Sequence, residues 1–104
     1  MAQFDVYRNR YRRSQAEIPY LLDVQHALLD SLATRVVVPL VRAEIFGKPA
    51  RVLNPILRIE GSRVVMSTTE LAGVGTKSLG VLVANAAAER MAILAAIDIL
   101  WVGV

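Results

Sequence analysis

The sequence predicts an α+β fold in which five or so antiparallel strands are followed by one C-terminal helix. Three observations support this prediction. The first two-thirds of the chain holds short apolar runs, several of which alternate with polar residues at the period of a half-buried strand. Gly and Pro separate these runs as turn signals. Towards the C-terminus the pattern changes to helix formers, and no linker interrupts the chain, so a single domain over residues 1–104 is expected.

The N-terminal half is predicted to form three strands. Residues 3–7 alternate apolar and polar side chains, and residues 20–24 form a second short strand after a polar loop. Residues 27–33 fit either a helical turn or a loop. Residues 35–46 are a long run rich in Val and Ile. Because Pro39 cannot donate a ladder hydrogen bond, we expect this strand at an edge of the sheet, or bent or bulged at Pro39.

A hairpin is predicted after these strands. Residues 52–60 alternate apolar and polar side chains, and residues 64–66 are again apolar. The segment between them, Glu60-Gly61-Ser62-Arg63, is typical of a tight hairpin turn. The glycines among residues 73–80 then indicate a flexible connection.

The last part of the chain is predicted to be a helix over about residues 82–100. Residues 84–91 are rich in helix formers. Apolar side chains lie on several faces of this helix, with Met91, Leu94, Ala95 and Asp98 on one face and Ile93, Ile97 and Leu100 on another. We therefore expect the helix to be buried on more than one side.

The composition is unusually aliphatic for a small domain. Hydrophobic residues make up 55% of the chain and charged residues only 20%, which excludes a disordered protein. The apolar surplus, concentrated in residues 36–41 and 91–104, indicates burial against a second copy or another partner. The net charge of +3 is compatible with an acidic partner but is too small to assign nucleic-acid binding.

The absence of cysteine limits the possible chemistry. It excludes disulfides, Cys-based zinc sites and thiol catalysis, and it fits a cytosolic protein. Residues 1–13 are polar and Arg-rich without an apolar core, so no secretory signal is recognised. Residues 91–104 are apolar but too few to cross a bilayer.

No catalytic constellation stands out. His26 is the only histidine, and the nine acidic residues are scattered without a pair suited to acid–base work. Residues 73–78 contain Gly, Thr, Lys and Ser but lack the spacing of a phosphate-binding loop. We therefore expect no bound cofactor and no metal.

The most distinctive charged segment follows the first predicted strand. Residues 8–13 contain four arginines, with tyrosines interleaved at positions 7 and 11. Guanidinium groups at this density could bind carboxylates or phosphates in a bidentate manner, or they could form a solvated loop. Because the whole-chain charge is small, an acidic protein segment is favoured over nucleic acid.

The chain end is a second distinctive segment. Residues 101–104 are apolar and include Trp101, the only tryptophan, whereas chain ends are usually polar and frayed. Trp101 either docks into the core or a dimer seam, or it inserts into a partner. Asp98 lies within the same apolar stretch, so it must reach the surface or pair with an arginine.

An ordered set of segments resembles the CcdB toxins from end to end. No single motif is decisive, and the order carries the resemblance. The segments are Gln3-Phe4-Asp5-Val6-Tyr7, Asp23-Val24-Gln25, Val37-Val38-Pro39-Leu40, Leu53-Asn54-Pro55-Ile56-Leu57-Arg58-Ile59, Thr68-Thr69-Glu70-Leu71-Ala72, Ala96-Ile97-Asp98-Ile99-Leu100 and Gly103-Val104.

This resemblance implies both a fold and a function. The fold is an SH3-like antiparallel β barrel or sheet with a C-terminal α-helix, assembled as a homodimer whose core includes residues 36–41. The function is that of a non-enzymatic toxin of a type II toxin–antitoxin system in the bacterial cytoplasm, of the kind used in plasmid maintenance. Such toxins bind the A subunit of DNA gyrase and trap its cleavage complex. A small CcdA-like antitoxin with a disordered tail neutralises them.

The resemblance also implies two sets of site residues. In the family, the last three residues, Trp-Gly-Ile, contact gyrase. The corresponding positions here hold Val102, Gly103 and Val104, so that Trp101 lies one position early. Two further gyrase-binding positions map to Leu28 and Asp98. The basic loop fits an acidic antitoxin tail, which gives the antitoxin-binding residues Arg8, Arg10, Tyr11, Arg12 and Arg13.

Two alternatives remain open at this point. The displaced Trp101 is compatible with a homologue of the same fold that does not poison gyrase. The Arg-rich loop, together with Thr68 and Thr69, is compatible with a MazF-like endoribonuclease, which would have to stabilise charge on a phosphate.

Overall fold

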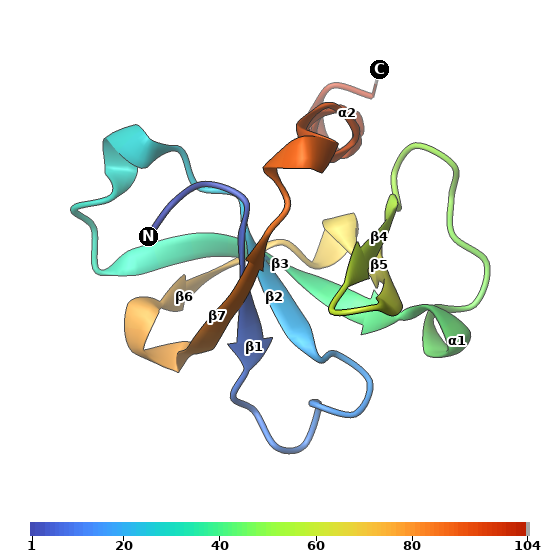
Figure 1. The fold of residues 1–104 in the computed structure, drawn as a ribbon. Coiled ribbons are helices and arrows are strands. Elements are labelled where there is room, and N and C mark those ends of the chain that lie inside the picture. Colours follow the sequence, from blue (N-terminus) through green and yellow to red (C-terminus); the bar gives the residue numbers. More distant parts are fainter. Residues whose placement is uncertain (104) are drawn as a thin grey trace.

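The structure, a computed structural model that describes residues 1–103, is a curled antiparallel half-barrel with one long helix across it (Figure 1). The strands are β1 (Asp5–Asn9), β2 (Tyr20–Asp23), β3 (Thr34–Arg42), β4 (Ile56–Ile59), β5 (Ser62–Met66), β6 (Ala72–Gly75) and β7 (Leu79–Asn85). The α-helices are α1 (Ala43–Phe46) and α2 (Arg90–Trp101), and single 3-10 turns are η1 (Ala27–Leu29), η2 (Thr68–Glu70), η3 (Thr76–Ser78) and η4 (Ala87–Glu89). The predicted α+β fold class is confirmed.

Strand β3 is at the centre of the sheet, which corrects the expectation that it lies at an edge. The strand order is β4-β5-β3-β2-β1-β7, and β6 pairs with the first half of β3. On that side of β3, residues 34–37 pair with β6 and residues 40–42 pair with β5. Pro39 lies between the two partners, where its carbonyl accepts a hydrogen bond from the Ser67 amide at 3.0 Å. Its missing N–H would face the same gap, so the proline removes no ladder bond.

The hairpin prediction is confirmed. Ile59 is opposite Ser62, which leaves Glu60 and Gly61 as a two-residue loop. Both have positive φ, 51° and 81°, as a type I′ turn requires. Such a turn matches the twist of the strands it joins.

The connection at residues 73–80 and the helix start are corrected. Residues 72–75 form β6 and residues 79–85 form β7, so only η3 connects them, and the helix begins at Arg90. At the end of β7, the side-chain oxygen of Asn85 accepts a hydrogen bond from the Ala87 amide at 2.9 Å. An asparagine side chain that mimics a backbone turn in this way interrupts the helix formers around it.

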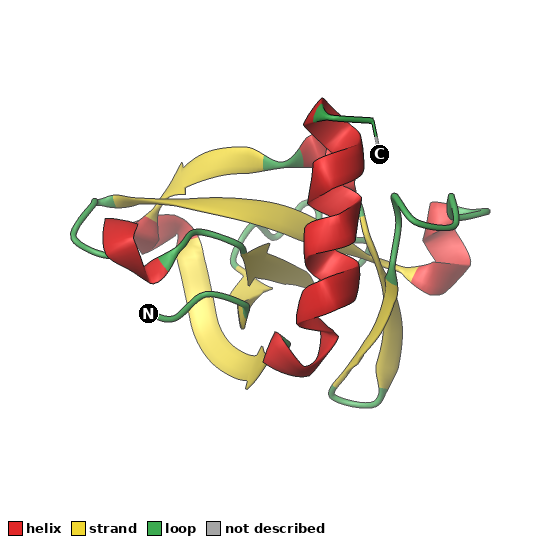
Figure 2. Cartoon of the chain, turned by 90° about the horizontal axis from the view of Figure 1, so that it is seen from above, coloured by secondary structure: helices red, strands yellow, loops and turns green. Residues whose placement is uncertain are grey.

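The main core lies between the sheet and α2, which covers one face of the sheet (Figure 2). Ile93, Ala96 and Ile97 are the buried residues of α2. The other buried core residues are Phe4, Val6, Tyr20, Leu22, Val38, Leu40, Leu57, Ile59, Val64, Met66 and Ala86.

One expectation about the apolar surplus is wrong, and another is not met within a single chain. Val37, Val38, Leu40 and Val41 are buried within this chain's own sheet, so residues 36–41 do not form a dimer core. Within the chain, α2 is buried on one side only, and Met91 on its outer side is 80% exposed. Exposed apolar side chains remain on the outer side and the end of α2, on η1 and on β7.

Candidate functional site

The end of α2 presents two apolar side chains to solvent. Trp101 is the last residue of the helix and Val102 is its C-cap, and each is 64% exposed. Of the alternatives considered for Trp101, docking into the chain's own core is therefore excluded, and a dimer seam or another partner remains. Val102 keeps helical backbone angles, so the two side chains point about 100° apart around the helix axis.

Gly103 fixes the end of the helix. Its φ of 84° is in the left-handed region, which favours glycine. Its amide donates to the carbonyls of both Asp98 and Ile99 at 3.2 Å, and the bond to Ile99 is the one that defines an αL cap. The cap ends the helix directly after the exposed pair. Val104, the last of the predicted gyrase-binding residues, lies outside the described residues.

Asp98 and Leu28 are both at the surface but do not lie together. Asp98 is exposed on α2, which is one of the two outcomes expected for it, surface exposure or pairing with an arginine. Leu28 is 86% exposed on η1. Figures 1 and 2 both show η1 well apart from the C-terminal end of α2. Within one chain, the structure therefore brings Asp98, Trp101 and Val102 together and leaves Leu28 separate.

A buried polar network holds the segment that carries Leu28. Arg35 is fully buried in β3 and lies against the fully buried Asp23 of β2. The Arg35 Nε donates to Asp23 Oδ2 at 2.8 Å, and its Nη1 donates to Asp30 Oδ1 at 2.7 Å. Gln25 adds a bond from its side-chain amide to the Leu29 carbonyl at 2.9 Å. All three residues of η1 are non-buried, so these polar bonds rather than apolar packing fix its position.

In this network, each buried charge is stabilised by its partner of opposite sign. Burial raises the pKa of the Asp23 carboxyl, and the hydrogen bonds from the Gln25 amide and from Arg35 offset part of that rise. Burial alone would lower the pKa of Arg35, but its hydrogen bonds to Asp30 and Asp23 outweigh burial and raise that pKa. This network was not predicted, because nothing in the local pattern of residues 23–35 indicates that Arg35 is buried. His26 has a local role: its Nδ1 accepts the Leu28 amide at 3.1 Å.

Arg8 differs from the other arginines of the basic loop because it is already paired. Its Nη2 lies 3.0 Å from both carboxylate oxygens of Glu60 in the hairpin turn. The Tyr20 hydroxyl donates to the same carboxylate at 2.7 Å, and the Arg8 guanidinium lies 5.9 Å from the Tyr20 ring centroid. Tyr7 is buried and donates to Asp5. Tyr7 is therefore unavailable to a partner, whereas Arg8 is exposed and would contact a partner in competition with Glu60.

The other residues of the basic loop also face solvent. Arg10, Tyr11, Arg12 and Arg13 are all exposed, with Tyr11 at 72%. The buried Asn9 shapes the loop by donating to the Ser14 hydroxyl at 2.9 Å and to the Ile18 carbonyl at 2.8 Å. Asn9 is a positioning residue that sequence analysis missed, and a buried amide next to a polar loop is the signal that could have identified it.

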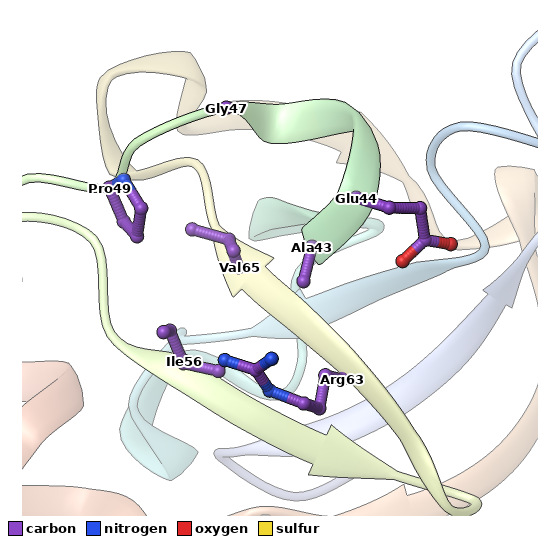
Figure 3. A pocket seen from close by; sticks show the side chains of 7 residues that line it. All are labelled: Ala43, Glu44, Gly47, Pro49, Ile56, Arg63 and Val65. Atoms are coloured by element: carbon purple, nitrogen blue, oxygen red, sulfur yellow. The ribbon is translucent and has the colours of Figure 1, made fainter.

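A separate pocket of about 340 Å³ lies between α1 and the β4–β5 hairpin (Figure 3). Val65 and Ile56 provide apolar walls, and Glu44 and Arg63 lie on opposite sides. None of the predicted site residues lines it. It is therefore distinct from both candidate partner-binding surfaces.

Two further observations concern the described chain as a whole. Among residues 1–103, no helix is long and apolar enough to span a membrane. Within the same residues, no three His, Cys, Asp or Glu side chains are grouped as a metal ion would require.

The comparison with protein families matches nearly the whole chain. The family model described as CcdB protein matches residues 3–103 of the 104. The match spans the half-barrel, the basic loop and the end of α2, and this family indicates a toxin of a toxin–antitoxin system. The chain belongs to the CcdB family.

Proposed function

We propose that this toxin binds the A subunit of DNA gyrase through the end of α2 and traps the gyrase–DNA cleavage complex. The observation that carries the proposal is the exposure of Trp101 and Val102 on a helix whose other side is anchored in the core. Tryptophan is enriched among the residues that dominate binding energy at interfaces. A rigid helix end loses little conformational entropy when such a side chain is buried by a partner. Asp98, one turn earlier, adds an exposed carboxylate beside the apolar pair.

The protein acts, in this proposal, as a homodimer in the bacterial cytoplasm. Beyond the end of α2, its exposed apolar side chains include Met91 on the outer side of α2 and Val81 and Leu82 on β7. A small domain with this much exposed apolar surface gains stability by burying it against a second copy. Light scattering on the purified protein tests this point, and a monomer at micromolar concentration would contradict it.

The antitoxin is proposed to bind the basic loop. The toxin itself is proposed to have no catalytic activity. Arg10, Arg12 and Arg13 are exposed cations that suit the carboxylates of an acidic, disordered tail. The endoribonuclease alternative loses one of its supports, because Thr68 is fully buried and its hydroxyl donates to the Leu53 carbonyl. Its side chain is therefore occupied within the core rather than facing a phosphate.

A pull-down with the gyrase A subunit tests the proposal. The intact protein should retain gyrase A, and a variant lacking residues 101–104 should not. Trp101→Ala should weaken retention strongly, whereas Val52→Ala, which shortens an exposed apolar side chain on the loop before β4, should not. Expression should arrest growth and accumulate cleaved DNA. Failure of the intact protein to bind gyrase A at micromolar concentration would sink the proposal in favour of a family member without gyrase poisoning.

The one-residue displacement of the tryptophan has its own test. Moving it back with Trp101→Leu and Val102→Trp should increase both gyrase binding and growth arrest if side-chain direction limits the interaction. Unchanged binding would show that direction is not the limiting factor.

A further inference from the structure

Strand β4 is a free edge of the sheet. It is the first strand in the order β4-β5-β3-β2-β1-β7, and among residues 1–103 it pairs with β5 alone. Just before β4, the Pro55 carbonyl accepts a hydrogen bond from the Met66 amide of β5 at 2.9 Å. Backbone groups of an antiparallel strand point alternately to its two sides. The odd-numbered residues of β4 therefore bond to β5, and the N–H and C=O groups of Ile56 and Arg58 point to the open side.

The open side of β4 faces space rather than another strand. A pocket of about 200 Å³ lies there, lined by residues 57–60 of the hairpin and by residues of β7 and η4, but by none of β5. Ile56 and Arg58 are both exposed. Unpaired backbone groups along such an edge are a template on which an extended chain can add as a further strand.

Two arginines stand side by side next to this edge. Arg58 of β4 is directly opposite Arg63 of β5, so both side chains lie on the same face of the hairpin. Like charges at directly opposite positions destabilise a sheet. The ion pairs found among residues 1–103 involve only Arg8 and Arg35 as cations, so within those residues neither member of this pair has a carboxylate at ion-pair distance.

Protection of the edge explains only one of the two arginines. Charged side chains on an edge strand commonly prevent it from pairing with other molecules, and Arg58 fits this role. Arg63 does not, because β5 is paired on both sides, with β4 and with β3. The second guanidinium therefore needs another explanation.

Arg63 also lines the pocket between α1 and the hairpin. Its guanidinium extends along the pocket towards Ile56, and the Glu44 carboxylate is directed away from it (Figure 3). Ile56 is opposite Val65 in the register, and with Pro49 they form an apolar wall beside the cation. An apolar surface, two cations and unpaired backbone groups thus meet along one short strand.

We propose that an extended segment of a partner protein adds to β4 as a strand, with an apolar side chain beside Ile56 and a carboxylate beside Arg58 and Arg63. Side chains two residues apart on a strand share a face at a spacing of about 7 Å, so the segment carries an acidic residue two positions from the apolar one. The carboxylate relieves the repulsion between the guanidinium groups and accepts charge-assisted hydrogen bonds from them. This inference does not depend on the proposed function, because neither the end of α2 nor the basic loop contributes to the surface.

Fluorescence anisotropy with a labelled peptide tests the proposal. The peptide has blocked ends and the sequence Thr-Leu-Thr-Glu-Thr, and the control peptide carries Gln in place of Glu. Arg63→Gln should weaken binding of the Glu peptide about fivefold, as expected for one ion pair at an exposed site. Arg13→Gln removes the same charge from an exposed residue of the basic loop and should weaken binding less than about twofold. The Gln peptide should bind the parent protein about as weakly as the Glu peptide binds Arg63→Gln.

The backbone part of the proposal has separate readouts. The N–H groups of the peptide alternate between β4 and solvent, so N-methylation of one alternating set should abolish binding and N-methylation of the other should not. Saturating peptide should also slow hydrogen exchange at the amides of Ile56 and Arg58.

Three results would overturn the inference. Equal weakening by Arg63→Gln and Arg13→Gln would show that only total charge matters. Unchanged exchange at both amides of β4 under saturating peptide would exclude strand addition. An oligonucleotide of the same charge that bound as tightly as the Glu peptide would assign the arginines to phosphates instead.

A gyrase pull-down separates this inference from the proposed function. Arg63→Gln should retain the gyrase A subunit as the parent does, because Arg63 lies on β5 and not on α2. If neither protein retains gyrase A while the peptide still distinguishes Arg63 from Arg13, the proposed function fails and the β4 site stands.

Discussion

Replacing Arg35 with methionine should be among the most destabilising single changes in the chain. Arg35 and Asp23 are both fully buried, and the two side chains meet at 2.7–2.8 Å. Removing the guanidinium leaves the Asp23 carboxylate buried without a cation, and it also releases the bond to Asp30. Breaking a buried ion pair in this way costs about 3–5 kcal/mol. Because a domain of this size is stable by roughly 5–15 kcal/mol, much of the folding free energy should be lost.

Urea denaturation measures this loss, and two controls isolate its cause. Arg58→Met removes an exposed arginine of β4 and should change the free energy of unfolding by less than about 0.5 kcal/mol. Asp23→Leu combined with Arg35→Met should recover part of the loss, since no charge then remains buried. A loss below about 1 kcal/mol for Arg35→Met alone would refute the reasoning. Hydrogen exchange should also show faster opening of the segment that carries Leu28, because Arg35 anchors it through Asp30.

Two further predictions concern β1 and its contact with β7. Burial, with the neighbouring Asp5, raises the pKa of Tyr7 from 10.0 to about 12. The protonated hydroxyl therefore contributes stability to the fold that is fully present below pH 10 and is lost as the pH rises to 12. The free energy of unfolding should fall by roughly 2–3 kcal/mol over that range, and Tyr7→Phe should remove most of this pH dependence; an unchanged slope in Tyr7→Phe would contradict the assignment. Gly80→Ala places a Cβ only 2.7 Å from the Arg8 carbonyl oxygen and should cost about 1–3 kcal/mol in thermal or urea unfolding. Gly73→Ala, where nothing lies within 4 Å, should stay within about 0.5 kcal/mol, and equal effects of the two substitutions would argue against the clash.

The parts of the fold that sequence predicted are those set by local signals. Glu60 and Gly61 supply the two positive φ angles of a tight hairpin, so the turn between β4 and β5 could be read directly. The alternation in β1 and the Val-rich run of β3 likewise reflect side-chain direction along a strand. These signals need no knowledge of distant partners.

The errors arose where a distant partner decides the structure. β6 contains Gly73 and Gly75, which lower its local strand tendency, and it becomes a strand because it pairs with residues 34–37. Pro39 suggested an edge, but β3 changes partner at that point. The helix formers of residues 84–91 predicted a helix from about residue 82, but β1 pairs with β7 as far as Asn85.

The candidate site shows the same division. The cluster of arginines in residues 8–13 was visible in the sequence, but the pairing of Arg8 with Glu60 depends on a contact between residues 52 positions apart. Lys77 is brought beside this loop by a similar long-range contact, in which Arg10 donates to its backbone carbonyl, so its position could not be deduced from spacing. The position of the basic surface could therefore be predicted from composition, whereas the pairing of its charges depends on contacts between distant segments.

The displaced tryptophan can be understood from the two sides of α2. Ile93, Ala96 and Ile97 attach the helix to the sheet, and Trp101 and Val102 come after the last of them. Exchanging the two terminal side chains therefore changes no core contact. It rotates the indole by about 100° around the helix axis and moves it by about 1.5 Å along that axis. The position of the tryptophan is thus a property of the exposed end of α2 alone, and it can change while the fold of this chain is preserved.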